Sequence, residues 1–318
     1  MMMDTRDNRS PVDVRPLEAR DLEAVVALDR SIVGRSRRGY FERRLASALR
    51  DPKTHLQIAA AGPSGLVGFV LARIISGEYG RPEPAIMLEA VGVAPAVQHV
   101  GVGHSLMSAL GRKGVARGIR RVVTEVDWRN HGLLKFLDRA GFLLAPRALL
   151  ERKVQRMPLP ATDEALEQMP PRIRHLRADD FDAVVRIDEL ATGRNRSEYF
   201  RRKFEEALHE SGIAVSLVTE DDGFVVAFAM ARVDLGDFGH IEPTASLDTL
   251  GVQPSFSHKG YGRDMLTQMI DNLAALHVER LETEVAHDHF ELMGFLHRFG
   301  FVPSQRLVFE ATRAAPSP

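Results

Sequence analysis

A glycine-containing loop, residues 91–103, has the spacing of an anion-binding site. It runs from an expected strand, over a proline, to Gly101 and Gly103 at the expected start of a helix. Glycine lets the backbone come close to a ligand, and the amides of a first helical turn have no partner within the helix. The loop therefore predicts a seat for a diphosphate. The dinucleotide fingerprint is not matched, because its third glycine and its strand–helix–strand start near the N-terminus are missing.

The chain is a tandem duplication. A shift by half its 318 residues places Tyr40-Phe41 on Tyr199-Phe200 and Gly141-Phe142 on Gly300-Phe301, without a gap. This period exceeds the roughly 20–50 residues of a solenoid unit, so each copy should be a domain with its own core. We expect a first domain, a proline-bounded linker and a second domain, with boundaries at 1–156, 157–171 and 172–318.

Apolar periodicity predicts the same element order in both repeats, β-α-α-β-β-β-α-β-α-β-β. In the first repeat, strands are expected at Val12–Pro16, His55–Ala61, Leu66–Ile75, Ala85–Val93 and Arg120–Val126, and helices at Glu18–Arg30, Tyr40–Leu49, Val102–Arg117 and Asn130–Ala140. The second repeat should follow this order from Ile173 to about Ala311.

Composition narrows the class of partner. Lysine and arginine number 42 against 43 acidic residues, so nothing favours nucleic acid or an anionic membrane. There is no cysteine, which excludes thiolate chemistry and fits a reducing compartment. The segment Met1–Ser10 is polar, and no apolar stretch is long enough to span a bilayer. We expect a cytoplasmic protein with a small-molecule ligand, either a monomer with pseudo-dimeric repeats or a homodimer.

The loop and its surroundings resemble the GNAT acetyltransferase superfamily. Its acetyl-CoA loop reads Gln/Arg-x-x-Gly-x-Gly/Ala after a strand that ends in Val-x-Pro, as do Gln98, Gly101 and Gly103 after Val93-Ala94-Pro95. The resemblance spans nearly all of each repeat. It implies two tandem α+β domains, each with a mixed, mostly antiparallel sheet flanked by helices. It also implies an N-acetyltransferase that uses acetyl-CoA and no metal.

The resemblance further implies which residues hold acetyl-CoA. Loop amides would bind the diphosphate, and strand residues would pair with the pantetheine arm. In the first repeat these residues are Val91, Val93, Gln98, His99, Val100, Gly101, Val102, Gly103 and Asn130. In the second they are Leu250, Val252, Ser257, His258, Lys259, Gly260, Tyr261 and Gly262. Because Ser257 replaces Gln98 and His289 replaces Asn130, binding and catalysis by the second repeat stay open.

Acetyl transfer requires a neutral amine and hence a group that takes its proton. For this base we favour Glu89 and its counterpart Asp248, whose side chains strand alternation places on the same face as Val91 and Leu250. A similarly placed glutamate contacts the amine in related aminoglycoside acetyltransferases. The alternative is a strand carboxylate paired with an arginine such as Arg73 or Arg232.

The general acid has no clear candidate. Many family members carry a tyrosine on the last helix, but Leu137 and Leu296 occupy that position and continue an apolar stripe. Polar residues that recur near the adjoining strand could serve instead, or could be structural. They are Glu125, Asp127, Trp128 and His131 in the first repeat and Glu284, His287 and His289 in the second.

An arginine-rich loop recurs between the first two helices of each repeat. In the resembled fold this loop covers the acceptor pocket, so its arginines favour an acceptor with a carboxylate or phosphate. The candidate acceptor-binding residues are Arg35, Arg37, Tyr40, Arg194, Arg196 and Tyr199. The alternative is a solvated helix start with the tyrosines in the core.

These features predict an acetyl-CoA-dependent N-acetyltransferase that acts on the primary amine of a small acceptor. A protein of another class, a CoA-binding regulator or scaffold without turnover, is the alternative that the missing tyrosine supports. Modification of protein lysines is disfavoured, because the arginine-rich loops would repel a basic tail.

Overall fold

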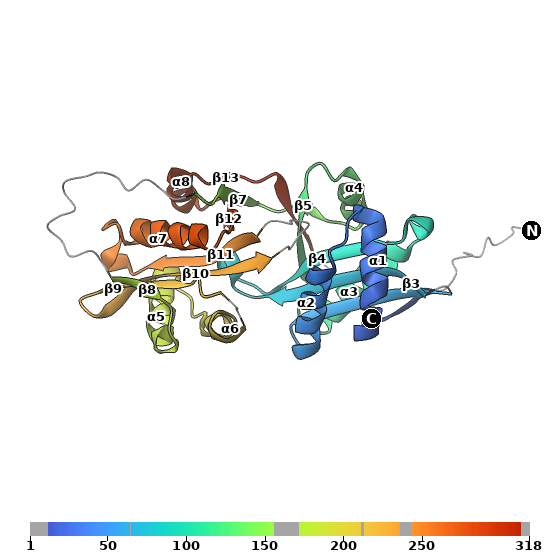
Figure 1. The fold of residues 1–318 in the computed structure, drawn as a ribbon, viewed down its shortest axis with the longest axis horizontal. Helices are drawn as coiled ribbons and strands as arrows, with labels where there is room; N and C mark the ends of the chain where they lie inside the picture. The colour runs from blue at the N-terminus through green and yellow to red at the C-terminus, as the bar shows by residue number, and fades with distance from the viewer. Residues whose placement is uncertain (1–11, 64, 156–171, 211–212, 236–242, 313–318) are drawn as a thin grey trace, which may run out of the picture. The chain divides into compact units, whose positions relative to one another are not determined.

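The computed structural model describes residues 12–63, 65–155, 172–210, 213–235 and 243–312. The chain forms two compact units, neither of which is one continuous segment (Figure 1). Unit 1 comprises Met1–Ile75, Glu83–Ala145 and Gln305–Pro318, and unit 2 comprises Ser76–Pro82 and Pro146–Ser304. The predicted linker, 157–171, lies outside the described residues.

Unit 1 has a seven-stranded sheet in the order β1-β2-β3-β4-β5-β14-β6. Its strands are β1 Asp13–Pro16, β2 His55–Gly62, β3 Gly65–Ile75, β4 Ala85–Val93, β5 Arg121–Asp127, β6 Leu143–Leu144 and β14 Arg306–Thr312. Its helices are α1 Leu22–Val33, α2 Arg38–Arg50, α3 Val102–Val115 and α4 His131–Arg139, with short 3-10 turns at η1 Ala19–Asp21 and η3 Pro95–Val97. The sheet is antiparallel except where β4 runs parallel to β5.

Unit 2 repeats this arrangement in the order β13-β7-β12-β11-β10-β9-β8. Its strands are β7 Arg147–Lys153, β8 Arg172–His175, β9 Leu217–Asp221, β10 Phe224–Leu235, β11 Pro243–Val252, β12 Arg280–Ala286 and β13 Val302–Pro303. Its helices are α5 Phe181–Thr192, α6 Ser197–Glu205, α7 Tyr261–Ala275 and α8 Phe290–Arg298, with short turns at η2 Glu78–Gly80, η5 Ala178–Asp180, η6 Glu206–Glu210 and η7 Pro254–Phe256. Figure 1 shows α5 and α6 on one face of this sheet and α7 and α8 on the other.

Each unit takes one strand from the other repeat. The C-terminal strand β14 pairs with β5 over seven residues, from Arg306↔Asp127 to Thr312↔Arg121. In the same way β7 pairs with β12, from Arg147↔Ala286 to Lys153↔Arg280. The compact units therefore differ from the boundaries expected from the repeats, because each last long strand completes the other sheet. The predicted order of elements along each repeat is observed.

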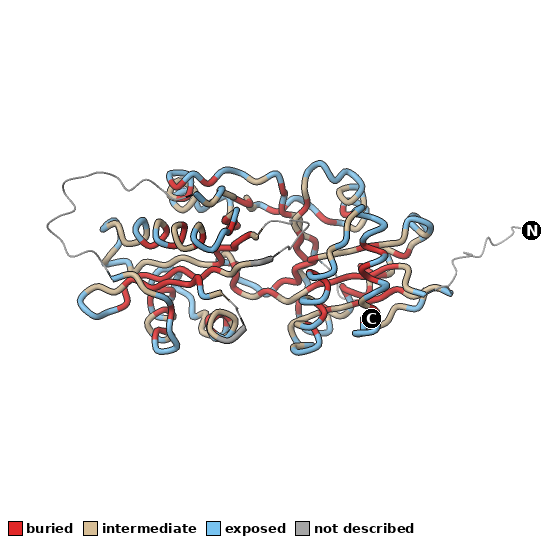
Figure 2. The backbone as a smooth tube through the Cα atoms, in the orientation of Figure 1, coloured by how far each residue is buried: buried red, intermediate tan, exposed pale blue. Residues whose placement is uncertain are grey.

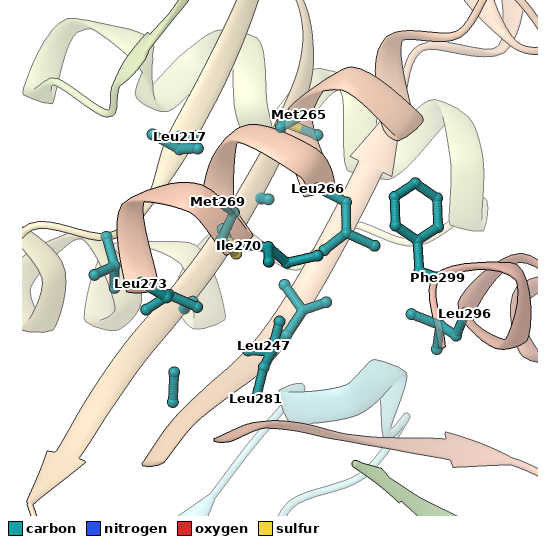
Figure 3. Close-up of a cluster of buried hydrophobic side chains, with 14 of the residues drawn as sticks. Leu217, Leu247, Met265, Leu266, Met269, Ile270, Leu273, Leu281, Leu296 and Phe299 are labelled. Carbon is teal, nitrogen blue, oxygen red and sulfur yellow. The ribbon is translucent and has the colours of Figure 1, made fainter. Parts of the chain in front are cut away.

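Apolar side chains fill both faces of each sheet. Figure 2 shows that much of each sheet is buried. In unit 1, one core lies under α3 and α4 and includes Leu106 and Leu137, and the other lies under α1 and α2 and includes Phe41 and Phe69. In unit 2, the corresponding core under α7 is drawn in Figure 3, where Met269 and other side chains of this helix point toward the strands. Burial of these amphipathic faces is the main stabilisation that the helices receive.

The parallel strands stay paired for only part of their length. The β4–β5 pairs are Ile86↔Val122 and Met87↔Val123, and the β11–β12 pairs are Thr244↔Arg280, Ala245↔Leu281 and Ser246↔Glu282. Beyond these residues the strands separate, so backbone groups of β4 and β11 become available to a ligand. The glycine loop of each repeat follows directly after this opening.

Candidate active site

The glycine loop begins helix α3 with its amides turned outward. Gly101 is the N-cap residue in a left-handed conformation, with φ of 97°, and His99 also has a positive φ, of 67°. The second repeat copies this backbone, since Gly260 has φ of 91° and His258 has φ of 62°. A residue with a Cβ is strained in such conformations. Both loops therefore offer an anion cradle at a helix N-terminus.

The side chains of the first loop leave this cradle open to solvent. Gln98, His99 and Val100 are exposed, and the Gln98 Nε2 donates a hydrogen bond to the Val93 carbonyl at 3.1 Å. Gly103 has a packing reason for being glycine, because an added Cβ would lie 2.7 Å from the Phe136 ring of α4. The prediction that Gly103 is needed for ligand approach thus has a structural alternative.

The second loop has charged residues of both signs near its helix start. The Tyr261 hydroxyl donates to Asp221 Oδ2 at 2.7 Å, and this bond raises the pKa of Tyr261 to about 12. Asp264 lies in the first turn of α7, where burial raises the pKa of its carboxyl. Lys259 lies over the Phe256 ring, with Nζ 4.6 Å from its centroid. The carboxylate of Asp264 would repel a diphosphate at this helix start.

The strand residues predicted to hold the pantetheine arm lie beyond the last parallel pairs of β4–β5 and β11–β12. Val91 and Val93 are half-buried and pack on the core under α3, and Leu250 and Val252 do the same under α7. A buried threonine bridges the strands next to the last parallel pair in each unit. The hydroxyl of Thr124 donates to the Leu88 carbonyl at 2.9 Å, and Thr283 donates to Leu247 at 2.8 Å. Neither threonine was singled out from the sequence.

Glu89 faces the helix pair α1–α2 and not the face of Val91. The β3–β4 register shifts between Leu71 and Ala72, so that β4 contains a bulge at Glu89. A bulge adds one residue and resets the alternation of side chains. The prediction that Glu89 and Val91 share a face was therefore wrong. The same correction holds for Asp248 and Leu250, because β10–β11 shifts between Met230 and Ala231.

The Glu89 carboxylate is buried and ion-paired through one of its oxygens. Oε1 accepts from Arg73 Nε at 2.9 Å and lies 3.3 Å from Arg44 Nη2, while the Glu89 side chain has 0% exposure. Among the described residues, Oε2 has no hydrogen-bond partner. A buried, unpaired oxygen carries a desolvation cost that a ligand donor would offset. The alternative of a pair with Arg73 is confirmed.

Asp248 in unit 2 has both oxygens engaged. Its Oδ2 accepts from the Lys203 ammonium at 2.8 Å, and Arg232 Nη1 lies 3.1 Å from Oδ1 and 3.2 Å from Oδ2. The predicted alternative, a pair with Arg232, is observed here too. Lys203 takes the place that Arg44 has in unit 1. A charged residue on a helix next to the sheet gives no signal in sequence that distinguishes it from a surface cation.

A second carboxylate in each unit is held by the exchanged strand. In unit 1 the Glu125 Oε2 lies 3.1 Å from Arg306 Nη1 of β14. In unit 2 Glu284 forms ion pairs with Arg147 of β7 and with Arg81, and all of these side chains are buried or nearly so. These contacts give the recurring Glu125 and Glu284 a structural role.

The arginine-rich loops bind their own helices. Arg37 forms a two-point ion pair with Asp29, with Nε–Oδ2 at 2.9 Å, and Arg196 pairs with Asp188 in the same way. These guanidinium groups also lie over the rings of the neighbouring tyrosines. Tyr40 and Tyr199 are buried in the core, as in the alternative interpretation. Arg35 is half-buried, and Arg194 is exposed.

Of the acid candidates in unit 1, Glu125, Asp127 and Trp128 have side-chain partners, and His131 is exposed at the start of α4. Leu137 and its counterpart Leu296 are buried in the cores, which confirms the apolar stripe. Asp127 accepts hydrogen bonds from Arg129, which lower the pKa of Asp127 to about 2. The Asn130 side chain caps α4 by accepting from the Leu133 amide at 3.1 Å.

Across the described ranges, no group of three or more His, Asp or Glu side chains is arranged to hold a metal ion. Of the helices in these ranges, none is long and apolar enough to span a membrane.

The cradle, the strand opening and the duplicated sheet define a class of protein. The chain belongs to the Acetyltransferase (GNAT) family, whose model matches residues 22–142 and 172–301, once in each repeat. This confirms the superfamily and the tandem α+β fold inferred from the glycine loop.

Relatives share this architecture at low identity. The chain is 25% identical over 201 residues to the mycothiol acetyltransferase of Propionibacterium freudenreichii subsp. shermanii, and the match covers 58% of this chain and 63% of that protein's length. It is similar to the tandem GNAT protein from the clavulanic acid biosynthesis pathway, with TM-score 0.64 and 15% identity over 96% of this chain and 100% of that one. A GCN5-related N-acetyltransferase from Sphaerobacter thermophilus gives TM-score 0.61 and 15% identity over 96% of both chains. These structural likenesses show the fold.

Proposed function

We propose that the chain is an acetyl-CoA-dependent N-acetyltransferase whose unit 1 acetylates the primary amine of a small acceptor. The observation that carries this proposal is the left-handed Gly101 cap at the mouth of the β4–β5 opening. The outward amides of the first turn of α3 would bind the diphosphate, and the freed backbone of Val91 and Val93 would hold the pantetheine arm. Acetyl-CoA supplies the activated acetyl thioester. The mycothiol acetyltransferase relative supports acetyl transfer in general.

Glu89 is the residue we assign to the acceptor amine. Its unpaired Oε2 can accept a hydrogen bond from the ammonium and then the proton, which leaves a neutral nitrogen for attack on the thioester. The Arg73 and Arg44 side chains hold the other oxygen and so orient the carboxylate. The chemical identity of the acceptor stays a prediction. An anionic group on it no longer draws support from Arg37, which binds Asp29.

Thiol release from acetyl-CoA with a panel of amines, amino acids and peptides tests the proposal. Glu89→Gln keeps the shape but cannot take a proton, so kcat should fall by about 100-fold or more while acetyl-CoA binding persists. Glu89→Asp should retain part of the activity. Pairs of acceptors with and without a carboxylate would test the anionic prediction.

Two outcomes would contradict the proposal. Unchanged turnover in Glu89→Gln would remove Glu89 from the reaction. Stabilisation of the protein by CoA without thiol release on any acceptor would favour the regulator or scaffold, which the leucine at position 137 supports.

A further inference from the structure

A short segment between β3 and β4, Ser76–Pro82, belongs to unit 2. Its helical turn η2 lies against both β11 and β12, the two strands that separate after Ser246↔Glu282. Glu78 and Arg81 in this segment are 2% and 3% exposed, although both are charged. The segment is thus built into the unit at the strand opening.

Side chains of unit 2 hold this segment by its backbone and its charges. The Arg196 guanidinium donates to the Gly77 carbonyl at 2.7 Å, and Arg202 donates to the Ser76 carbonyl at 2.8 Å. At the other end, Arg81 Nη2 lies 2.5 Å from Glu284 Oε1 of β12. Both partners of this ion pair are buried, so breaking it would leave the Arg81 guanidinium buried without this carboxylate, whereas Glu284 would keep Arg147.

Next to the segment, the Lys203 ammonium forms an ion pair with Asp248, the residue that corresponds to Glu89. Lys203 Nζ lies 2.8 Å from Asp248 Oδ2, 2.7 Å from Glu206 and 3.8 Å from Glu78 of the segment. Burial lowers the pKa of Lys203, but the three carboxylates outweigh burial and raise it, so the ammonium stays charged. Arg44 contacts Glu89 from the corresponding position in unit 1, so a cation on this carboxylate is common to both units, and the contact with Glu78 ties Lys203 to the segment.

Repeat two keeps its CoA cradle while its acceptor side is filled. CoA bound at the Gly260 loop would lie on the α7 side of the sheet. An acceptor would then approach from the opposite side, which α5 and α6 cover. That side holds Lys203 and the segment Ser76–Pro82. We propose that the segment Ser76–Pro82 acts as an internal occupant of the acceptor site of unit 2, with Lys203 beneath it, so that this unit takes no acceptor amine. The inference rests on the proposed function, because only acetyl transfer defines an acceptor site on this side of the sheet.

A matched pair of glycine substitutions tests this occupancy. A Cβ at Gly77 would lie 2.7 Å from Tyr199 Cγ, whereas a Cβ at Gly80 would have no atom within 4 Å. Both glycines have positive φ, of 96° and 68°, which asparagine tolerates better than most residues. Gly77→Asn should therefore displace the segment from Tyr199, and Gly80→Asn should leave it in place.

The readout is reductive methylation of lysines by formaldehyde and cyanoborohydride, followed by mass spectrometry. In the full-length wild type and in Gly80→Asn, Lys203 should react about tenfold or more slowly than the exposed Lys53, because it reacts only when the segment opens. In Gly77→Asn its rate should rise about fivefold or more. Hydrogen exchange in α7 should be equal in the three proteins, which excludes general unfolding.

Two results would overturn the inference. One is methylation of Lys203 as fast as that of Lys53 in the wild-type protein, a comparison that needs no variant. The other is an equal Lys203 rate in Gly77→Asn and Gly80→Asn with α7 protection retained. Because the labelling contains neither acetyl-CoA nor an acceptor, its failure and a failure of the thiol-release assay are independent.

Discussion

Arg306 of β14 forms a buried ion pair with Glu125 of β5, with 3.1 Å between Nη1 and Oε2, although the two residues come from opposite repeats. In unit 2 Arg147 and Glu284 repeat this relationship. The exchanged strand therefore brings a charge as well as backbone hydrogen bonds. Removal of either partner leaves the other charge buried.

Arg306→Ala should lower the free energy of unfolding of unit 1 by about 3 kcal/mol, because it leaves the Glu125 carboxylate without this partner. The single tryptophan of the chain, Trp128, donates to Gln305 at 2.6 Å and thus reports on the start of β14. Urea unfolding followed by Trp128 fluorescence measures the effect. Arg147→Ala, the matched change in unit 2, should shift this transition less. Equal shifts would show that the pair is not local to unit 1.

Deletion of the residues after Ser304 should weaken unit 1 and not unit 2. The deletion removes β14, so the amides and carbonyls of β5 on that edge lose their partners. Hydrogen exchange should then accelerate in Arg121–Asp127 and stay slow in Arg280–Ala286, which pairs with β7. The reverse pattern would mean that the C-terminal strand serves its own repeat.

Gly101→Ala should weaken CoA binding by about tenfold, because a left-handed alanine costs about 1–2 kcal/mol and turns the loop amides away. Gly260→Ala imposes the same strain, at φ of 91° against 97°. Isothermal titration calorimetry of both variants would assign each binding event to a repeat. We expect the tighter event to disappear with Gly101→Ala, since the first turn of α7 contains Asp264, whereas the first turn of α3 contains no acidic residue. If Gly101→Ala binds CoA as the wild type does, the cradle lies elsewhere.

Tyr261 should titrate at about pH 12, against an ordinary pKa of 10, because its hydroxyl donates to Asp221. The folded state holds this proton more tightly than the unfolded state. The bond therefore contributes its full stability below pH 10 and loses it as the pH rises to about 12. The tyrosinate absorbance that Tyr261→Phe removes measures the midpoint. In Asp221→Asn the midpoint should move back toward 10, and an unchanged midpoint would exclude this bond as the cause.

The element order and the glycine loop could be predicted because both depend on local sequence. Apolar periodicity located Ala85–Val93 as a strand and Val102 as the start of a helix, and the structure has both. Asn130 as the residue that opens α4 follows from the same kind of signal, a side chain that caps its own helix.

Other features depend on choices that local sequence does not encode. The bulge at Glu89 reverses the side-chain alternation, and no glycine or proline marks it. The strand exchange was not predicted because β7 and β14 carry the same pattern, so that either could complete either sheet in the same register. The pairing of Asp248 with Lys203 depends on where α6 packs.

The placement of β14 has a consequence for synthesis of the protein. The ribosome completes the first repeat before it synthesises residues 306–312. The edge of β5 that pairs with β14 therefore stays unpaired while the second repeat is translated. The N-terminal half therefore cannot reach its final form as the chain emerges. Its maturation depends on the synthesis of β14, and until then the open edge of β5 is where a strand of another protein would pair.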